Sequence, residues 1–206
     1  CIRDSSNGKL VRGWLTLKGK KYYFTSGTGA MVKGWQTNDA GTYYFDMTYG
    51  TMAKGNTTID GVPCSFDQTT GIGADCQWIE IDGVKYWYEG GRRQGLEGRG
   101  KEIYDPASDA WYWLDNVQQG AVAKSKDVYQ ESYAGRFADR EDGTGKWVRY
   151  DQWGKMIKGW DWGALDNNGI HQYFDETTGA MAKGDVWIGD EHWSFDWNTG
   201  YGTRLN

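Results

Sequence analysis

The sequence contains no run of 18 apolar residues, so no transmembrane helix and no membrane insertion are expected. Only two prolines occur in 206 residues, which excludes a Pro-rich linker. Lys and Arg form no block, and the formal net charge is −5, which argues against a nucleic-acid partner held through its phosphates. The common core residues Ile, Leu, Val and Phe are also scarce and together number 31, of which only 25 are aliphatic.

Aromatic residues and glycine take the place of the missing aliphatic residues. The chain has 13 Trp, 14 Tyr and 31 Gly, and aromatic residues make up 16% of it. A low aliphatic content indicates disorder when net charge is high and aromatics are few, and neither condition holds here. We therefore expect a folded chain whose core consists of stacked aromatic side chains.

A repeat of about 21 residues organises the sequence. Gly13-Trp14 and Tyr22-Tyr23-Phe24 recur 21 residues later as Gly34-Trp35 and Tyr43-Tyr44-Phe45. Each copy ends in Met, any residue, Lys and Gly, and the pattern returns near the C-terminus. Aromatic runs bounded by Gly, Asn, Asp and Thr are typical of β-hairpins. We expect each hairpin to pair an aromatic strand such as 21–25 with the Met-x-Lys-Gly segment, through a turn at 26–29.

A lone hairpin is marginal in water, so neighbouring hairpins must cover each other. The predicted fold class is all-β, a solenoid of stacked β-hairpin repeats of about 21 residues with an irregular central insertion. The predicted organisation is N-terminal hairpin repeats at 1–95, the insertion at 96–145 and C-terminal hairpin repeats at 146–206, forming one continuous array. The insertion holds one aromatic hairpin between long polar stretches, with a short helix expected around 127–133.

The repeat resembles a known family. Gly-Trp, Gly-Lys-Lys-Tyr-Tyr-Phe and Gly-Ala-Met-x-x-Gly-Trp resemble the cell-wall-binding repeats of Gram-positive surface proteins. Choline-binding, glucan-binding and clostridial toxin repeats are relatives of this type. The resemblance covers about 13–95 and 146–200. It implies ligand sites between successive hairpins of a non-catalytic binding module, secreted or on the cell surface, whose partner is a cell-wall polymer or glycan.

In choline-binding members of this family the site is an aromatic cage, because a quaternary ammonium donates no hydrogen bond and is held by π faces and Met. The resemblance implies two candidate sets of ligand-binding residues: Trp14, Tyr22, Trp35 and Tyr43 in the first, and Trp147, Met156 and Trp160 in the second. Choline repeats usually begin the aromatic strand with Trp, whereas this chain has Lys21 and Thr42 there. That departure keeps glucan open beside choline as the ligand.

A second hypothesis comes from a different class of function. The chain would be a bacterial adhesin that binds a host protein through the 97–145 insertion, with the hairpins as a scaffold. Aromatic residues and Arg are typical of interface hot spots. The possible partner contacts are Trp111, Trp113, Tyr129 and Arg136.

The remaining residues give little support to catalysis. His171 and His192 occupy the same position in their repeats, and no Cys-x-x-Cys or His-rich spacing indicates zinc. We expect no enzyme activity, no cofactor and no metal. Cys64 and Cys76 are expected on the two strands of one hairpin, where a disulfide would contribute about 3 kcal/mol. The alternative is two buried thiols.

Overall fold

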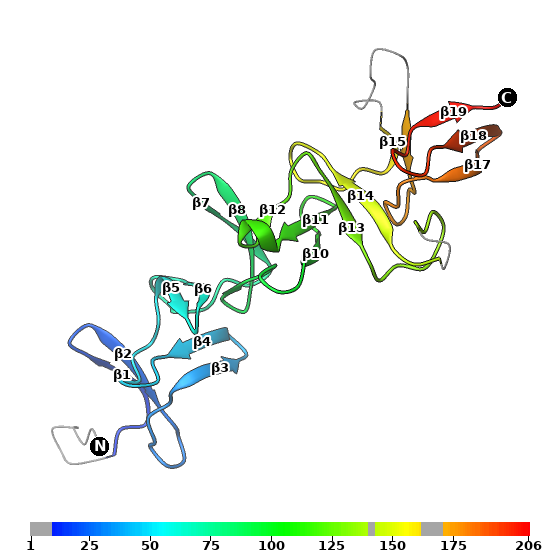
Figure 1. Cartoon of the computed structure of the whole chain (residues 1–206). Helices are drawn as coiled ribbons and strands as arrows, with labels where there is room; N and C mark the ends of the chain where they lie inside the picture. The colour runs from blue at the N-terminus through cyan, green and yellow to red at the C-terminus, as the bar shows by residue number, and fades with distance from the viewer. Residues whose placement is uncertain (1–9, 140–142, 162–170) are drawn as a thin grey trace. The chain divides into compact units, whose positions relative to one another are not determined.

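The computed structural model describes residues 10–139, 143–161 and 171–206 (Figure 1). The described part of the chain is all-β, with strands of two to six residues and a single 3-10 turn, η1 (Asn116–Gln118). No helix in these residues is long and apolar enough to cross a membrane. The predicted all-β class is therefore confirmed, and most of the sheets in the described residues are two-stranded hairpins.

The chain divides into two compact units. The first consists of Cys1–Arg99 with Asn116–Ala121, and the second of Gly100–Asp115 with Val122–Asn206. The sequence-based division into three segments remains a prediction.

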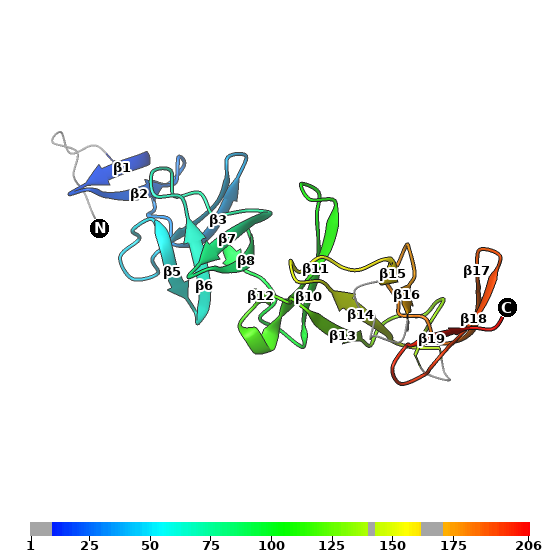
Figure 2. The same ribbon diagram turned by 90° about the horizontal axis from the view of Figure 1, so that it is seen from above.

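The first unit holds four consecutive antiparallel hairpins and one additional strand. β9 (Arg92–Arg93) pairs with both the third and the fourth hairpin, and Ala121 of β12 (Ala121–Val122) pairs with Tyr86. Figure 2 shows the two strands of the third hairpin side by side. The hairpins are β1 (Gly13–Leu17) with β2 (Lys20–Phe24), β3 (Gly34–Asn38) with β4 (Gly41–Phe45), β5 (Gly55–Ile59) with β6 (Val62–Phe66), and β7 (Gln77–Ile81) with β8 (Val84–Glu89).

The second unit also holds four hairpins, and the last carries a third strand, β19 (Gly202–Arg204). The hairpins are β10 (Gly100–Asp105) with β11 (Ala110–Asp115), β13 (Lys126–Gln130) with β14 (Lys146–Tyr150), β15 (Gly159–Asp161) with β16 (Gln172–Phe174), and β17 (Gly184–Ile188) with β18 (Glu191–Phe195).

The strand pairing within a repeat differs from the expectation. The aromatic strand β2 pairs with the preceding Gly-Trp strand β1, whereas the Met31 segment makes only an isolated bridge to Phe24. The chain reverses at Lys18-Gly19, where φ is 50° and 75°. Two positive φ values are typical of a type I′ turn, whose twist matches that of paired strands. The expected hairpin turn at 26–29 is therefore a loop between repeats.

The central insertion also differs from the expectation. Residues 100–105, predicted as loop, form β10 and pair with the aromatic strand β11. Residues 126–130, where a helix was expected, form β13 and pair with β14. Val128 of β13 is buried, which suits a strand packed on a core. The segment therefore contains one complete hairpin, β10 with β11, and the strand β13, whose partner β14 lies just beyond it.

The first residue pair of five hairpins joins a glycine to a phenylalanine. Each Phe is at most 3% exposed and forms the core of its repeat. Glycine is required opposite Phe45, because Gly34 has a φ of 74°, which L side chains rarely adopt. The pairs are Gly13–Phe24, Gly34–Phe45, Gly55–Phe66, Gly159–Phe174 and Gly184–Phe195.

Backbone hydrogen bonds connect successive hairpins within each unit. The carbonyl of the residue three positions before the buried core residue, an aromatic or Leu114, accepts from the segment that follows the next hairpin. Buried backbone groups need such partners, so these bonds fix the spacing between repeats. They are Met52 to Lys21 and Gly73 to Thr42 in the first unit, and Met156 to Trp111, Met181 to Trp147 and Gly202 to His171 in the second.

Candidate aromatic binding sites

Three aromatic rings meet where the first hairpin packs on the second. Trp14 of β1 lies 4.9 Å from Tyr23, its cross-strand partner, and 5.7 Å from Tyr43 of β4, measured between ring centroids. Phe45 lies behind them, 6.0 Å from Trp14. Tyr43 is buried, whereas Trp14 is 49% exposed, so about half of its side chain is open to solvent. We call Trp14, Tyr23 and Tyr43 the N-terminal aromatic site.

The same positions build a second cluster near the C-terminus. Trp160 of β15 lies 5.1 Å from its cross-strand partner Tyr173 and 4.7 Å from Trp193 of β18. Trp193 stands two residues before Phe195, as Tyr43 stands two before its Phe. The ring of His171 is 6.1 Å from Trp160. We call Trp160, Tyr173 and Trp193 the C-terminal aromatic site.

Burial affects the ionisation of the Tyr173 hydroxyl in the C-terminal aromatic site. The Tyr173 hydroxyl donates to Glu176 Oε1 at 3.3 Å. Burial raises the pKa of Tyr173, and the neighbouring Glu176 carboxylate raises it further. Tyr173 therefore stays neutral at physiological pH and presents an uncharged ring beside Trp160.

The geometry of both sites suits a cation without hydrogen-bond donors. Aromatic faces carry negative quadrupole potential, and a cation within about 6 Å of a centroid gains about 0.5–2 kcal/mol per ring. In the N-terminal site the Lys21 Nζ already lies 5.9 Å from the Trp14 centroid. Rings from two successive hairpins converge in each site, so a small ligand would contact both.

The second and third hairpins repeat this arrangement with one change. Trp35 lies 5.1 Å from Tyr44 and 5.8 Å from Phe66, but Cys64 stands where the N-terminal site has Tyr43. The Arg92 guanidinium lies 4.0 Å from the Trp35 centroid. We call Trp35, Tyr44 and Phe66 the Trp35 site.

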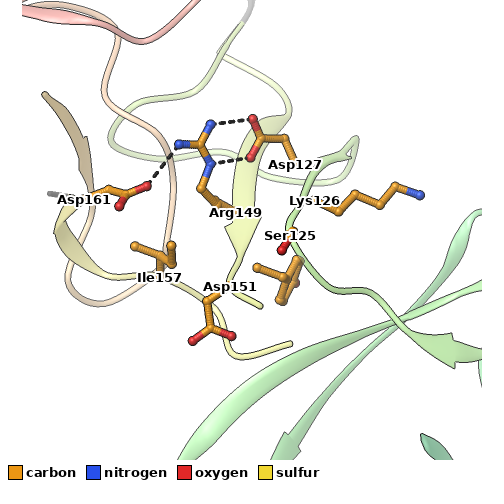
Figure 3. A pocket seen from close by; sticks show the side chains of 8 residues that line it. Ser125, Lys126, Asp127, Arg149, Asp151, Ile157 and Asp161 are labelled. Carbon is orange, nitrogen blue, oxygen red and sulfur yellow. Dashed lines mark hydrogen bonds and ion pairs between the residues drawn. The ribbon is translucent and has the colours of Figure 1, made fainter. Parts of the chain in front are cut away.

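The same positions carry charged groups in the second unit. Asp127 and Arg149 form the cross-strand pair that Trp14 and Tyr23 form in the first hairpin. Arg149 donates from Nε and Nη2 to the two Asp127 oxygens at 2.7 and 2.8 Å and from Nη1 to Asp161 at 3.0 Å (Figure 3). Arg149 also donates to Gln172, which stands two residues before Phe174. We call Asp127, Arg149, Asp161 and Gln172 the ionic cluster.

A polar pocket of about 350 Å³ opens beside the ionic cluster. The hydrogen bonds and charge of Asp127 raise the Arg149 pKa, so the guanidinium is always charged. The carboxylates of the cluster are therefore already neutralised by a partner within the protein. The pocket is lined by Ser125, Lys126, Asp127, Arg149, Tyr150, Asp151, Ile157 and Asp161 (Figure 3).

Among the residues that the structure describes, no group of three or more His, Cys, Asp or Glu is placed to hold a metal ion.

The structure divides the first predicted residue set between two sites. Trp14 and Tyr43 come together, whereas Trp35 belongs to the Trp35 site. Tyr23, the cross-strand partner of Trp14, takes the place expected of Tyr22, which pairs with Leu15. The sequence reasoning missed Tyr23 because it paired the aromatic strand with the wrong segment.

The second predicted set is not brought together. Trp147 packs on Tyr129 at 5.2 Å and its Nε1 donates to Asp139 at 3.1 Å. Met156 packs against a core cluster that includes Trp113, Val148 and Tyr150. Trp160 instead joins Tyr173 and Trp193, and neither partner was singled out from the sequence. Tyr173 lies opposite Trp160 on the paired strand, and Trp193 lies on the next hairpin. These positions in the repeat are the signal that could have found both residues.

The proposed partner contacts do not form one exposed surface. Trp113 is only 9% exposed and belongs to the core, so its expected role on the surface is wrong. Tyr129 packs on Trp147, whereas Trp111 is 37% exposed and lies 5.3 Å from Tyr104. Arg136 donates to the Trp187 carbonyl at 3.0 Å.

The expected disulfide is absent. Cys64 lies on β6, where it is 1% exposed, and its thiol is 3.4 Å from the Val62 carbonyl. Cys76 is exposed, with its Sγ 3.9 Å from Asp75 Oδ1, and no bond joins the two sulfurs. The pairing was inferred from a hairpin that the structure does not form, since Cys76 follows the loop after β6. Burial raises the pKa of the Cys64 thiol.

Comparisons with known proteins agree with this architecture. The choline-binding repeat family matches residues 11–56, which include the whole N-terminal aromatic site. This segment therefore carries a choline-binding repeat, and the resemblance to Gram-positive cell-wall-binding repeats is confirmed. A search of curated proteins found no match.

Two solved structures from Streptococcus pneumoniae share the fold. The choline-binding domain of CbpL is 23% identical with a TM-score of 0.59, and the match covers 94% of this chain and 87% of that one. The modular autolysin LytC, solved with a synthetic peptidoglycan ligand, is 22% identical with a TM-score of 0.61. That match covers 98% of this chain and 40% of the autolysin, so the chain spans less than half of the autolysin's length.

Proposed function

We propose that this chain is a non-catalytic module of a secreted or surface protein that anchors to the cell wall of a Gram-positive bacterium. Its N- and C-terminal aromatic sites bind quaternary ammonium groups such as choline on a wall polymer. The observation that carries this proposal is the convergence of three rings around the half-exposed Trp14.

Residue chemistry favours choline over a glucan at these sites. The Trp14 ring is tilted by about 60° to both Tyr23 and Tyr43, which suits a compact cation. A sugar would stack on one flat face and need polar groups beside it. Residues 11–56, which match the choline-binding repeat, contain all three rings. The choline-binding domain of CbpL has the same fold. So does the autolysin LytC, which was solved with a synthetic peptidoglycan ligand.

Two similar sites on one chain would act together on a polymer. A repeated wall ligand engages the second site at a high effective concentration after the first has bound, which raises avidity by about 100-fold or more. We propose that the hairpins stack as a solenoid that presents both sites, since the same inter-hairpin hydrogen bonds recur in each unit.

The test is a choline titration into the millimolar range followed by Trp fluorescence, with sodium chloride as the ionic control. We expect a saturable change in the wild type. Trp14→Ala and Trp160→Ala should each remove one site, and the double variant should not bind. Trp153→Ala is the matched control, because Trp153 is 67% exposed and belongs to neither site.

No saturable change in the wild type would refute the proposal for choline. A response to a wall glycan without choline would then favour the glucan alternative. Equal loss in Trp153→Ala and Trp14→Ala would show that the aromatic sites are not where the ligand binds.

A further inference from the structure

We propose that Arg92 is a built-in cation that fills the Trp35 site and keeps it closed to an external quaternary ammonium ligand. This inference rests on the proposed function, because it concerns a third position with the same geometry. It predicts that the native chain uses its N-terminal and C-terminal aromatic sites while the Trp35 site stays occupied by the protein itself.

The contact between Arg92 and Trp35 is close. The guanidinium carbon is 4.0 Å from the Trp35 centroid, whereas the Lys21 Nζ of the N-terminal site is 5.9 Å from the Trp14 centroid. A guanidinium is planar and weakly hydrated, so it stacks on an aromatic face better than an ammonium does. Arg92 therefore covers the ring face that a ligand cation would need.

The backbone holds Arg92 in this place. β9 follows the fourth hairpin and joins it to the third, and its Arg92 pairs with Cys64 of β6 and with Glu89 of β8. The Gly91 carbonyl accepts from the Ser65 amide at 2.8 Å, and the Gly91 amide donates to the Ala74 carbonyl at 2.7 Å. Both backbone polar groups of Gly91, the residue that precedes Arg92, are therefore hydrogen-bonded and hold the start of β9 in place.

Glycine at position 91 makes this approach feasible. Its φ is 83°, and a Cβ there would lie 3.1 Å from Phe66 Cε1 and 3.2 Å from the Gly73 Cα. A larger residue would push β9 away from the Trp35 site. Cys64 completes the arrangement, because its short side chain replaces the ring that Tyr43 supplies in the N-terminal site.

A tethered cation competes strongly with a soluble one. Intramolecular groups reach effective concentrations in the millimolar range or above, comparable to the ligand concentration that a single aromatic cage needs. Arg92 therefore keeps the Trp35 site occupied at ligand concentrations in this range. Removal of the guanidinium is therefore the direct way to open it.

The first experiment follows the indole N–H signals by NMR during a choline titration. In the wild type we expect the Trp14 and Trp160 signals to shift and the Trp35 signal to stay in place. In Arg92→Ala the Trp35 signal should also shift and saturate, which adds one site per chain. Lys85→Ala is the control, because it removes the same charge from an exposed position on β8. Trp35→Leu assigns the Trp35 signal.

Two results would overturn the inference. One is a Trp35 signal that responds to choline in the wild type, and the other is a Trp35 signal that does not respond in Arg92→Ala. Failure of the proposed function is distinct, because it means that neither Trp14 nor Trp160 responds in the wild type.

A second measurement needs no ligand. The Arg92 side-chain methylene signals should be shifted upfield by the Trp35 ring, and Trp35→Leu should return them to ordinary values. Unshifted Arg92 signals in the wild type would overturn the inference whether or not choline binds. Near-ultraviolet circular dichroism checks that each variant is folded.

Discussion

The N-terminal aromatic site and the ionic cluster occupy the same positions of the hairpin repeat and have opposite chemistry. Trp14 and Tyr23 form the cross-strand pair in one, and Asp127 and Arg149 form it in the other. The aromatic pair leaves half of Trp14 open to solvent. The two members of the charged pair satisfy each other's hydrogen-bonding groups, since Arg149 donates to both Asp127 oxygens. A single backbone arrangement therefore provides either an open site or a closed structural contact.

This difference shows which part of the repeat is structural. Both regions keep a buried aromatic residue at the end of the second strand, Phe24 in one and Tyr150 in the other. Both also keep an isolated bridge from that residue to a methionine. The cross-strand pair beside it is the variable part. The position of a residue pair in the repeat therefore does not by itself determine whether that hairpin binds a ligand.

The largest effect should come from breaking the ionic cluster. Arg149→Met leaves the carboxylates of Asp127 and Asp161 without their partner in a partly buried place. We expect the free energy of unfolding to fall by about 3 kcal/mol, as for other buried ion pairs that lose one member. Urea denaturation measures it. Lys158→Met, at an exposed position, should stay within about 0.5 kcal/mol of the wild type. Equal effects of the two variants would contradict a structural role of the cluster.

A smaller loss of stability should follow from opening the N-terminal aromatic site. Trp14→Ala removes ring contacts worth about 1 kcal/mol, because half of the side chain already faces solvent. Choline affinity at that site should fall by about tenfold or more, which corresponds to about 1.4 kcal/mol. Arg149→Met should therefore mainly lower the free energy of unfolding, whereas Trp14→Ala should mainly lower choline affinity. A loss of stability in Trp14→Ala as large as in Arg149→Met would mean that Trp14 serves the core.

The sequence predicted the repeat well because its period is set by backbone requirements. Gly34 opposite Phe45, and the same pair in other repeats, recur at nearly fixed spacing and mark the hairpins. The strand pairing could also have been found. Asp60-Gly61 and Asp82-Gly83 are type I′ turn signals between the strands that actually pair.

The ligand sites were harder to predict, because they depend on which strands pair and on contacts between segments far apart in the sequence. Tyr23 becomes part of a site only once β1 is known to pair with β2. Arg92 reaches Trp35 from 57 positions along the chain, through a strand that joins the third and fourth hairpins. No periodicity marks such a contact, so only the folded structure reveals it.

Acid should act on the aspartate that follows the core aromatic residue in several hairpins, among them the third and the last. In the last hairpin Asp196 accepts from the Asn198 and Thr199 amides at 3.0 and 2.7 Å and from the Thr199 hydroxyl. These hydrogen bonds lower the pKa of Asp196, and similar ones lower the pKa of Asp67. Their contribution is complete above the unfolded pKa of about 3.9 and is lost as pH falls through the lower folded pKa.

We expect thermal stability to decline in acid below about pH 4 for this reason. Asp196→Asn should be less stable than the wild type at pH 6, and the difference should shrink as pH falls through the folded pKa. Thermal melts between pH 6 and 2.5 measure it. A constant difference across this range would show that the charge of Asp196 is not involved.

The smallest effect on the fold should come from chemical labelling of the cysteines. The labelling compares Cys64, which lies beside the Trp35 site, with Cys76 on the surface. Burial raises the pKa of the Cys64 thiol and covers it, so iodoacetamide at pH 7.5 should leave Cys64 unmodified. Cys76 is exposed and should react with little change in stability. Peptide mapping by mass spectrometry distinguishes the two. Rapid labelling of Cys64 in the folded protein would mean that β6 opens readily, and Arg92 could not then be held firmly over Trp35.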